Sequence, residues 1–518
     1  MRPEPSLPPL SGPALGLLTL VLPLATFMQV VDTTIANVAV PTIAGDLGAS
    51  FSQGTWIITS YTVANAIVLP LTGRLARQFG ELRLFLTSTA LFAITSFLCG
   101  IAPDLGTLVV CRTLQGALGG PMMPLAQTLL LNNCPRERHP MTIALWSMTV
   151  SVAPVFGPIL GGWISGNYHW GWIFFINVPV AALVLVLTSR LLNGRESETA
   201  RANWSAASFG LLALGLGTFQ LMLDRGKELD WFNSTEITAL ALTALVSLTF
   251  LLIWERHNPH PLLDLSLFRL RNFTIGLTLI SLGMMLYLGT VVLLPLLLQT
   301  QYGYTATWAG LVTAPIGFLT VCLTPLIGKY GAKIGLRPII CFGFLLLAFC
   351  MHLRSNFAPE MDIWFVIWPQ FIQGAALAAF FTPIITLAFA NLSPSQMAGA
   401  SGLFNCIRTL FGAVGASVVT TLWERRQAWH HARLSGLLDP YNPQLGQALE
   451  NLAAQGLTLD QAYLILTRQI TKQGYILAAA EIYRLCILAF LLMAFVVWLA
   501  RPAEPQAISK TGGAGPGK

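Results

Sequence analysis

Long apolar stretches follow one another along the whole chain and constrain its fold more than any other feature. A helix needs roughly twenty predominantly apolar residues to cross a bilayer, and soluble domains carry about 25% charged residues. Here only 10% of the 518 residues are charged and 54% are hydrophobic. This composition excludes a cytosolic enzyme, a disordered chain and a nucleic-acid binder, and it predicts an all-α membrane protein. The fourteen expected spans are 14–40, 53–72, 84–101, 107–131, 141–163, 173–192, 205–223, 235–254, 272–298, 305–327, 338–353, 364–390, 398–422 and 477–500.

The distribution of Lys and Arg predicts the orientation of these spans. Both residue types are concentrated in alternate connectors, such as 73–83, 190–201 and 256–271, and are sparse in the short connectors between them. Connectors rich in Lys and Arg remain in the cytoplasm. An even number of spans places both chain ends on one side. We therefore expect the tails 1–13 and 501–518 to be cytoplasmic.

Two connectors on the expected inner side resemble each other. Gly73 and Gly80 are seven residues apart and are followed by Arg83, and Gly328 and Gly335 repeat that spacing at an offset of 255 residues. We expect these five residues to have gating or structural roles. A chance recurrence of Gly-rich turns is the alternative.

A second echo pairs the run RTLQGA, beginning at Arg112, with QFIQGA, beginning at Gln370, at an offset of 258 residues. The similar offsets favour one structural unit that occurs twice. Two like-oriented bundles with a site between them suit a rocking transporter. The sequence therefore predicts two six-helix bundles with an inserted helix pair. The expected units are the tail 1–13, the first bundle 14–192, the linker with inserted helices 193–271, the second bundle 272–500 with its outer segment 423–476, and the tail 501–518.

The outer segment 423–476 has the apolar spacing of a helix and few helix breakers. Such spacing is typical of an amphipathic helix. We expect a short helix or hairpin that lies over the outer mouth of the bundles, and a solvated cap without a partner is the alternative.

Asp32 is the only one of the 22 carboxylates that lies well inside an expected span. At the helical rise of 1.5 Å per residue, Asp32 lies about 13 Å and Arg112 about 9 Å from the outer ends of their spans, so the side chains can meet. An intramembrane charge costs about 2.5 to 3.5 kcal/mol even on lenient scales and is usually functional. We expect Asp32 to alternate between a protonated form and an ion pair with Arg112. The alternatives are a structural anchor for Asp32 and a helix-to-helix contact for Arg112.

The fifth expected span combines close packing with a possible bend. Gly157 and Gly161 lie on one helix face, which allows another helix to approach closely. Pro158 removes a backbone hydrogen bond. Together with Pro154 and Gly162, these residues predict a gate near the outer end of the span.

A polar cavity is expected between the two bundles. Asn405 and Arg408 share a helix face, and Arg408 lies about 15 Å from the inner end of its span. A cation at that depth is expected to face the interior of the bundle, and it suits an anionic compound or a structural partner. For the aromatic candidates, ordinary packing or an interfacial belt is the alternative. The further cavity candidates are Phe27, Met28, Trp56, Gln115, Phe156, Tyr287 and Gln373.

The chain resembles the major facilitator superfamily, and specifically its fourteen-span drug/proton antiporter branch. The resemblance rests on segments such as ATFMQVVDTTIANVAVPTIAGDLGAS, QGTWIITSYTVANA, NYHWGWIFFINVP, DRGKELDWF, DLSLFRLRNFTIG and WPQFIQG. It places Asp32 in the family's first-span motif and Arg112 in its fourth-span motif, and it identifies the Gly-Pro run as the antiporter motif. One departure is Arg77, which stands where the family usually carries an acid.

The resemblance also implies the activity and its partners. It implies proton-driven export of small amphipathic drugs, with the proton gradient as the energy source and no cofactor. Membrane lipid would surround the protein in the inner membrane of a Gram-negative bacterium. A periplasmic adaptor and an outer-membrane channel would complete a tripartite pump.

The sequence leaves two other functions to consider. One is a dedicated exporter of a single metabolite, such as a fatty acid or a siderophore. The other is a membrane-embedded enzyme, but none of the seven histidines has a catalytic or metal-binding spacing, and no phosphate-binding loop is present. The sequence thus offers no catalytic or metal-ligating residue.

Overall fold

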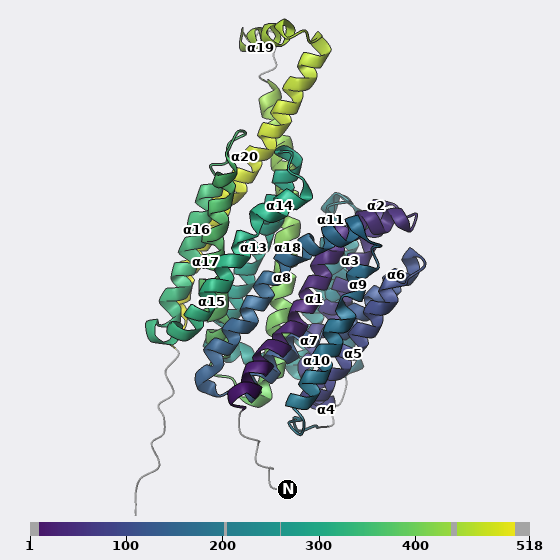
Figure 1. Cartoon of the computed structure of the whole chain (residues 1–518), viewed down its shortest axis with the longest axis vertical. Coiled ribbons are helices and arrows are strands. Elements are labelled where there is room, and N and C mark those ends of the chain that lie inside the picture. Colours follow the sequence, from purple (N-terminus) through teal and green to yellow (C-terminus); the bar gives the residue numbers. More distant parts are fainter. Residues whose placement is uncertain (1–9, 201–204, 259–260, 437–442, 503–518) are drawn as a thin grey trace, which may run out of the picture.

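The computed structural model describes residues 10–200, 205–258, 261–436 and 443–502, and these ranges are helical with short connectors (Figure 1). Most of the two expected tails lies outside the described residues. The α-helices are α1 Gly12–Asp46, α2 Phe51–Gly54, α3 Trp56–Val68, α4 Thr72–Phe79, α5 Glu81–Gly100, α6 Leu105–Gly119, α7 Met122–Asn133, α8 His139–Asn167, α9 Trp172–Phe175, α10 Asn177–Leu191, α11 Ala206–Gly226, α12 Thr235–His257, α13 Arg271–Gln301, α14 Ala306–Thr313, α15 Pro315–Ile334, α16 Leu336–Arg354, α17 Ile363–Phe389, α18 Pro394–Ser435, α19 Pro443–Ala454 and α20 Leu459–Val496.

The described residues contain 12 helices that are long and apolar enough to cross a membrane, or 13 if α8 is counted as one bent span. The molecule is therefore a multi-pass membrane protein, but the expected count of fourteen is not confirmed. The expected span 107–131 forms two shorter helices, α6 and α7, which meet at Gly120 and Pro121. Pro121 lacks a backbone N–H and cannot continue the hydrogen-bond ladder of α6.

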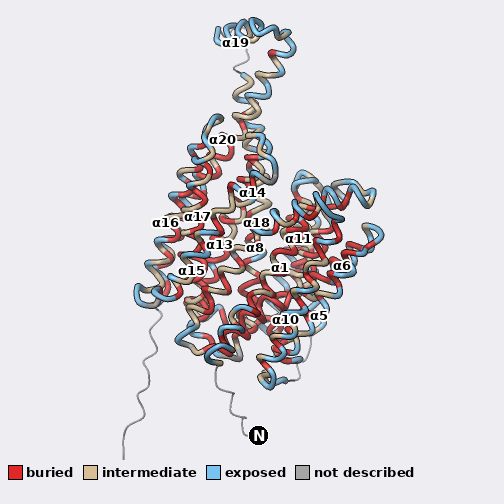
Figure 2. Tube along the Cα trace, viewed as in Figure 1, coloured by how far each residue is buried: buried red, intermediate tan, exposed pale blue. Residues whose placement is uncertain are grey.

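The helices gather into two groups. In the first half, α1 packs against α7, α8 and α10, and α3 packs against α6; in the second half, α13 packs against α17 and α18, and α16 against α17 and α20 (Figure 1). The helices α11 and α12 pack on each other, and α11 also contacts α3 and α18. Most buried residues lie inside the two groups (Figure 2). We call the side where α1 begins and α20 ends the terminal side, and the opposite side the α19 side.

The segment after the thirteenth expected span differs from its prediction. Helix α18 continues unbroken to Ser435, α20 begins at Leu459, and the two project beyond the bundles with α19 at their tip (Figures 1 and 2). The expected helix or hairpin over the outer mouth is therefore wrong in its placement. Charged residues such as Glu424 end a hydrophobic run but do not break a helix. Helices α18 and α20 pack against each other, and Trp423 Nε1 donates a hydrogen bond from α18 to the Tyr475 carbonyl oxygen of α20 at 2.9 Å.

The two repeated segments that begin at Arg112 and Gln370 occupy equivalent packing positions. A Cβ added at Gly116 on α6 would overlap the carbonyl oxygen of Tyr61 on α3, and one added at Gly374 on α17 would overlap the carbonyl oxygen of Ile316 on α15. The offsets between these pairs are the 255 and 258 residues of the sequence repeats. Each glycine therefore allows close contact between two helix backbones, α6 with α3 in the first half and α17 with α15 in the second. The two halves thus contain equivalent helix contacts.

Substituting either glycine by alanine should destabilise the protein. Overpacking typically costs about 1–3 kcal/mol, and here the obstacle is backbone, which yields less than a flexible side chain. We expect Gly116→Ala and Gly374→Ala each to lower the thermal unfolding midpoint of the purified protein by several degrees. Gly162→Ala is the matched control, because a Cβ there meets open space. Unfolding midpoints equal to that of the control would contradict the prediction.

Candidate functional site

A fully buried ion pair lies inside the first bundle. Asp32 on α1 and Arg112 on α6 are joined by 2.7 Å between Oδ2 and Nη1, and neither side chain is exposed. The contact agrees with the similar depths calculated for the two residues. The structure thus brings together the two residues that the sequence selected for proton coupling.

The Arg112 guanidinium has further partners from three directions. Its Nε donates to the Ile57 carbonyl oxygen at 3.1 Å, and its Nη1 donates to Gln115 Oε1 at 2.7 Å. Its Cζ atom lies 4.2 Å from the centre of the Tyr61 ring. Gln115 was expected to line the cavity, but its side chain is buried and serves this network because it lies one helical turn after Arg112.

Asn177, which the sequence did not single out, also holds the carboxylate. Asn177 on α10 donates to Asp32 Oδ1 at 2.6 Å and to Ser96 Oγ on α5 at 2.9 Å. Gln115 Nε2 donates to the same Asp32 oxygen at 3.2 Å. The available signal for Asn177 was a lone amide within the apolar run WIFFINVPVAAL. Helices α6 and α10 therefore meet α1 at one carboxylate, and α5 contacts the Asn177 amide.

The charge of Asp32 holds this arrangement together. The carboxylate balances Arg112 and accepts the amide hydrogen bonds. A buried guanidinium without its partner would be costly, by about 3–5 kcal/mol. The attachment of α6 to α1 therefore depends on the charge of one carboxylate.

Removing the Asn177 amide should weaken this site without removing its charges. We expect Asn177→Ala to lower the free energy of unfolding by about 1–3 kcal/mol, because a buried carboxylate loses a donor, and to slow proton-coupled transport. The control is Asn167→Ala, whose exposed amide contacts only the Trp163 carbonyl oxygen of its own helix. Thermal unfolding and vesicle transport measure the two effects, and unchanged values for Asn177→Ala would exclude the role.

The other cavity candidates of the first half lie in different surroundings. Phe27 on α1 and Phe156 on α8 form an edge-to-face pair with ring centres 5.9 Å apart, and Phe156 remains largely exposed. Trp56 lies at the start of α3 with the Arg225 guanidinium 5.9 Å from its ring. Met28 is buried in the core. Only the two phenylalanines lie together.

Tyr287 and Gln373 are buried in the second bundle. Gln373 accepts a hydrogen bond from Arg354, the last residue of α16. Arg354 is only 1% exposed, although it lies just beyond the expected span 338–353. Arg354 also donates to Gln370 Oε1 at 2.6 Å. Gln373 therefore contacts a buried cation, and Tyr287 is 8% exposed.

Polar contacts join the two halves at α7 and α18. Ser401 donates to Gln127 Oε1 at 2.7 Å and Asn405 donates to the same oxygen at 3.2 Å. Arg408 is buried, with Nη2 3.2 Å from Met123 Sδ. Gln127 was missed by the sequence analysis.

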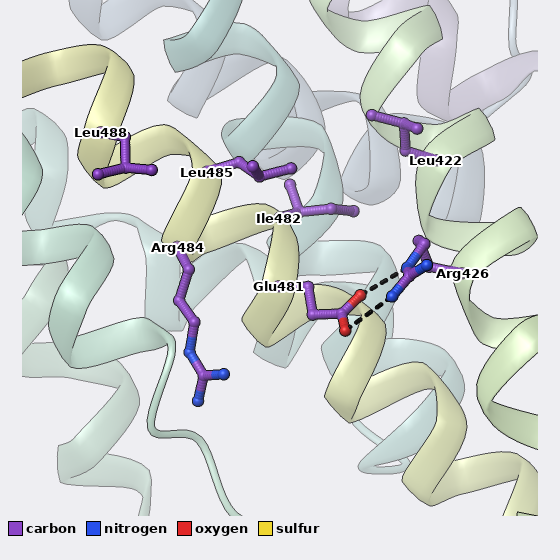
Figure 3. Close-up of a pocket in the computed structure, with 7 residues that line it drawn as sticks. All are labelled: Leu422, Arg426, Glu481, Ile482, Arg484, Leu485 and Leu488. Atoms are coloured by element: carbon purple, nitrogen blue, oxygen red, sulfur yellow. Dashed lines mark hydrogen bonds and ion pairs between the residues drawn. The ribbon is translucent and has the colours of Figure 1, made fainter. Parts of the chain in front are cut away.

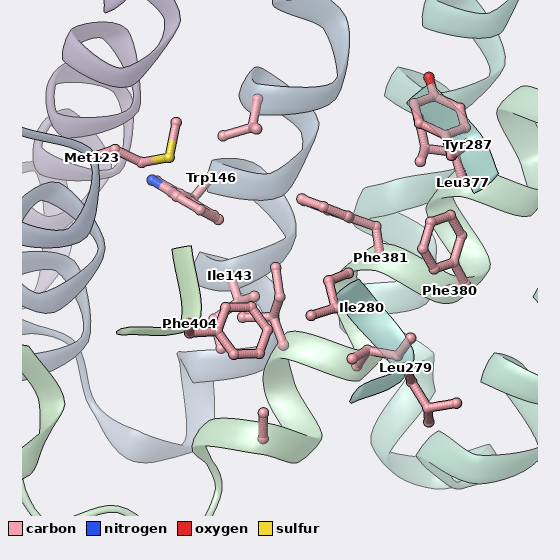
Figure 4. Packing of buried hydrophobic residues seen from close by; sticks show 14 of the residues in the cluster. Met123, Ile143, Trp146, Leu279, Ile280, Tyr287, Leu377, Phe380, Phe381 and Phe404 are labelled. Carbon is pink, nitrogen blue, oxygen red and sulfur yellow. The ribbon is translucent and has the colours of Figure 1, made fainter. Parts of the chain in front are cut away.

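Apolar side chains of both halves surround these contacts. Met123 and Trp146 from the first half belong to one buried cluster with Ile280, Phe381 and Phe404 from the second (Figure 4). Asn405 and Arg408 therefore lie at the boundary of the halves, where relative movement of the bundles would expose them.

The repeated glycines bring the two halves together on the terminal side. A Cβ added at Gly73 on α4 would overlap the backbone of Gly399 on α18, and one added at Gly328 on α15 would lie 2.8 Å from the Ala144 Cβ on α8. Each glycine thus lies in one half and contacts the other. These contacts close the terminal side of the molecule.

The second glycine of each connector makes a turn. Gly80 and Gly335 have φ values of 90° and 97°, which favour glycine, and each separates two helices. Backbone N–H groups of Leu82 and Arg83 donate to the Glu196 carboxylate at 2.9 Å, so Glu196 caps α5. The Arg83 guanidinium lies 3.8 Å from that carboxylate.

The Gly-Pro run produces a bend and a close contact. Helix α8 bends by 43° between His139–Pro154 and Ile159–Asn167. A Cβ at Gly161 would lie 3.0 Å from the Ile35 carbonyl oxygen, and one at Gly157 would overlap Thr34, both on α1. Gly162 faces open space, and the Pro158 side chain lies outside the described residues. The two glycines of this run therefore pack within the first half, against α1, while Ile159 in the same run lies next to Gly310 of the second half.

Membrane-spanning helices in two equivalently packed halves are the architecture of a secondary transporter. A model of the Major Facilitator Superfamily matches residues 22–416. The chain belongs to the Major Facilitator Superfamily, as the sequence predicted.

Curated relatives are similar over nearly the whole chain. The multidrug export protein EmrB of Escherichia coli K12 is 51% identical over 495 residues, which cover 95% of this chain and 97% of the relative. The fatty acid resistance protein FarB of Neisseria gonorrhoeae is also 51% identical over 495 residues, covering 96% and 98%. Their names refer to multidrug export and to fatty acid resistance.

Solved structures support the fold. The human organic anion transporter MFSD10 has a TM-score of 0.58 at 12% identity, covering 94% of this chain and 100% of that chain. The proton:xylose symporter XylE has a TM-score of 0.54 at 15% identity, covering 92% and 96%.

Proposed function

We propose that this chain is a proton-driven antiporter that exports hydrophobic and amphipathic compounds by alternating access. The observation that carries the proposal is the fully buried Asp32–Arg112 pair, whose stability depends on the charge of one carboxylate. The similarity to multidrug export proteins supports the direction of transport and the type of substrate.

The distribution of Lys and Arg supports a cytoplasmic terminal side and a periplasmic α19 side. Both chain ends are then cytoplasmic in a Gram-negative inner membrane. In this orientation, the Gly73–Gly399 and Gly328–Ala144 contacts close the cytoplasmic side, and the structure corresponds to a state closed toward the cytoplasm.

The transport cycle follows from the two states of Asp32. Drug enters the deprotonated protein from the cytoplasm or the inner leaflet and leaves on the periplasmic side. A proton from the periplasm then neutralises Asp32, loosens its link to Arg112 and favours the return to the inward-facing state. The proton gradient supplies the energy, and no cofactor takes part.

We also propose that the protein works as the inner-membrane part of a tripartite pump, with a periplasmic adaptor and an outer-membrane channel. The projecting ends of α18 and α20, with α19 at the tip, offer a contact surface beyond the bilayer (Figure 1). Adaptor contact within 423–476 would give these extensions a function.

A second candidate is the export of a single anionic metabolite such as a fatty acid. Buried Arg408 supports it, because its guanidinium lies at the boundary of the halves and makes no ion pair among the described residues. The similarity to FarB points the same way. Export of neutral or cationic drugs equal to that of a fatty acid would favour the multidrug function.

The test uses inside-out vesicles that contain the purified protein. With an imposed proton gradient, we expect drug accumulation and drug-induced proton release, and both should stop when the gradient is collapsed. Transport that continues without the gradient would exclude proton coupling, and chemical turnover of the compound in detergent would favour an enzyme.

A further inference from the structure

A groove between α18 and α20 opens on the lipid-facing surface of the second bundle. The groove holds about 420 Å³, within the range of small-molecule sites. Its apolar walls come from Leu422, Leu485 and Leu488, and the last two are 60% and 67% exposed (Figure 3). Three charged residues also line it: Arg426, Glu481 and Arg484.

Two of the three charges neutralise each other. Arg426 Nε and Nη2 donate to the two carboxylate oxygens of Glu481 at 2.6 and 2.9 Å, which is the bidentate geometry of a strong pair (Figure 3). Arg484 has no hydrogen bond or ion pair among the described residues. Its side chain points away from Leu488 (Figure 3). The groove therefore contains one uncompensated positive charge.

The depth of Arg484 makes this charge unusual. The apolar run of α20 continues to Leu499, about 22 Å along the helix from Arg484. A hydrocarbon core is about 30 Å thick, which places Arg484 roughly 8 Å below the boundary on the α19 side. A long side chain can reach the headgroup region from there. An anionic headgroup above acyl chains matches both the charge and the apolar walls.

We propose that this groove binds one anionic phospholipid, whose phosphodiester is held by Arg484 and whose acyl chain lies along Leu485 and Leu488. Arginine suits this ligand because its guanidinium forms paired hydrogen bonds to phosphate oxygens. The lipid would bridge α18 and α20 next to the Arg426–Glu481 ion pair, at the base of the projecting helices. This inference is independent of the transported compound.

The test compares purified full-length variants by native mass spectrometry with phosphatidylglycerol or phosphatidylethanolamine added. We expect the unmodified protein to retain one more phosphatidylglycerol molecule than Arg484→Gln, with no such difference for the zwitterionic lipid. Arg484→Lys should keep part of the binding. Arg468→Gln is the matched control, because Arg468 is exposed on the same helix beyond the bilayer.

The experiment compares the number of lipid molecules that each variant retains, because the presence of lipid alone would not identify the site. Arg269, Arg271 and Arg501 line a second hollow on the terminal side, where anionic lipid can also bind. Equal phosphatidylglycerol retention by the unmodified protein and Arg484→Gln would overturn the proposal, provided that both unfold at the same temperature in lipid-free detergent. The proposal would also be overturned if the groove retained no lipid and instead bound a transmembrane helix of another protein.

Discussion

Vesicles containing Asp32→Asn should show neither drug-induced proton release nor drug accumulation. Asparagine cannot exchange a proton, and it leaves the Arg112 guanidinium buried without the carboxylate that lies 2.7 Å away in the unmodified protein. We expect the variant to reach the membrane, but its free energy of unfolding should fall by about 3–5 kcal/mol, as found when one partner of a buried ion pair is removed. Normal proton release by this variant would end the proposed mechanism.

A second variant separates loss of coupling from loss of folding. Asp32→Asn combined with Arg112→Gln removes the orphaned cation, so the double variant should recover much of the stability but none of the coupling. Asp46→Asn is the matched control, because it changes an exposed carboxylate at the end of the same helix. Recovery of proton release in the double variant would show that another group carries the proton.

Gly73→Ala should hold the protein open on its terminal side. The added Cβ would overlap the Gly399 backbone, so the two halves must separate for it to fit. A penalty of about 1–3 kcal/mol on the closed state corresponds to roughly a 5- to 150-fold shift in population. We expect the transport rate in vesicles to fall by at least about fivefold. Spin labels at the exposed residues Phe79 and Ile334, at the ends of α4 and α15, should report a longer distance.

The contact between Gly73 and Gly399 also provides a matched control variant. Gly399→Ala changes the other glycine of the same contact, but a Cβ built there meets open space. This variant should transport normally and keep the shorter label distance. If Gly73→Ala and Gly399→Ala behave alike, the contact does not control closure, and Gly73 is only a packing residue.

The sequence predicted the helices and the charge pair because both follow from quantities that are local along the chain. The length of an apolar run indicates whether a helix can span the membrane. The helical rise per residue then places Asp32 and Arg112 at similar depths. Even the short span expected at 338–353 is a helix, α16. The superfamily followed from motifs spread over almost the whole chain.

The sequence could not show which faces of the helices meet. Asn177 and Arg354 are the clearest cases: one reaches the Asp32 carboxylate, and the other is buried against Gln370. Both contacts depend on how neighbouring helices rotate, which hydropathy does not record. Hydropathy also marked the end of the apolar run near Trp423, although α18 continues to Ser435 because helix formation does not require apolar residues.

The continuity of α18 has a mechanical consequence. The helix begins near Gly399, in the contact between the halves, and ends at Ser435 beyond the bilayer. The stretch from Gly399 to Ser435 spans about 54 Å. A rotation of the second half by about 10° around the contact at Gly399 would move the far end by roughly 9 Å, with no hinge needed between them. Under the proposed rocking movement, the projecting tip would therefore act as a lever arm, and a small rotation of the bundle would give a large displacement outside it.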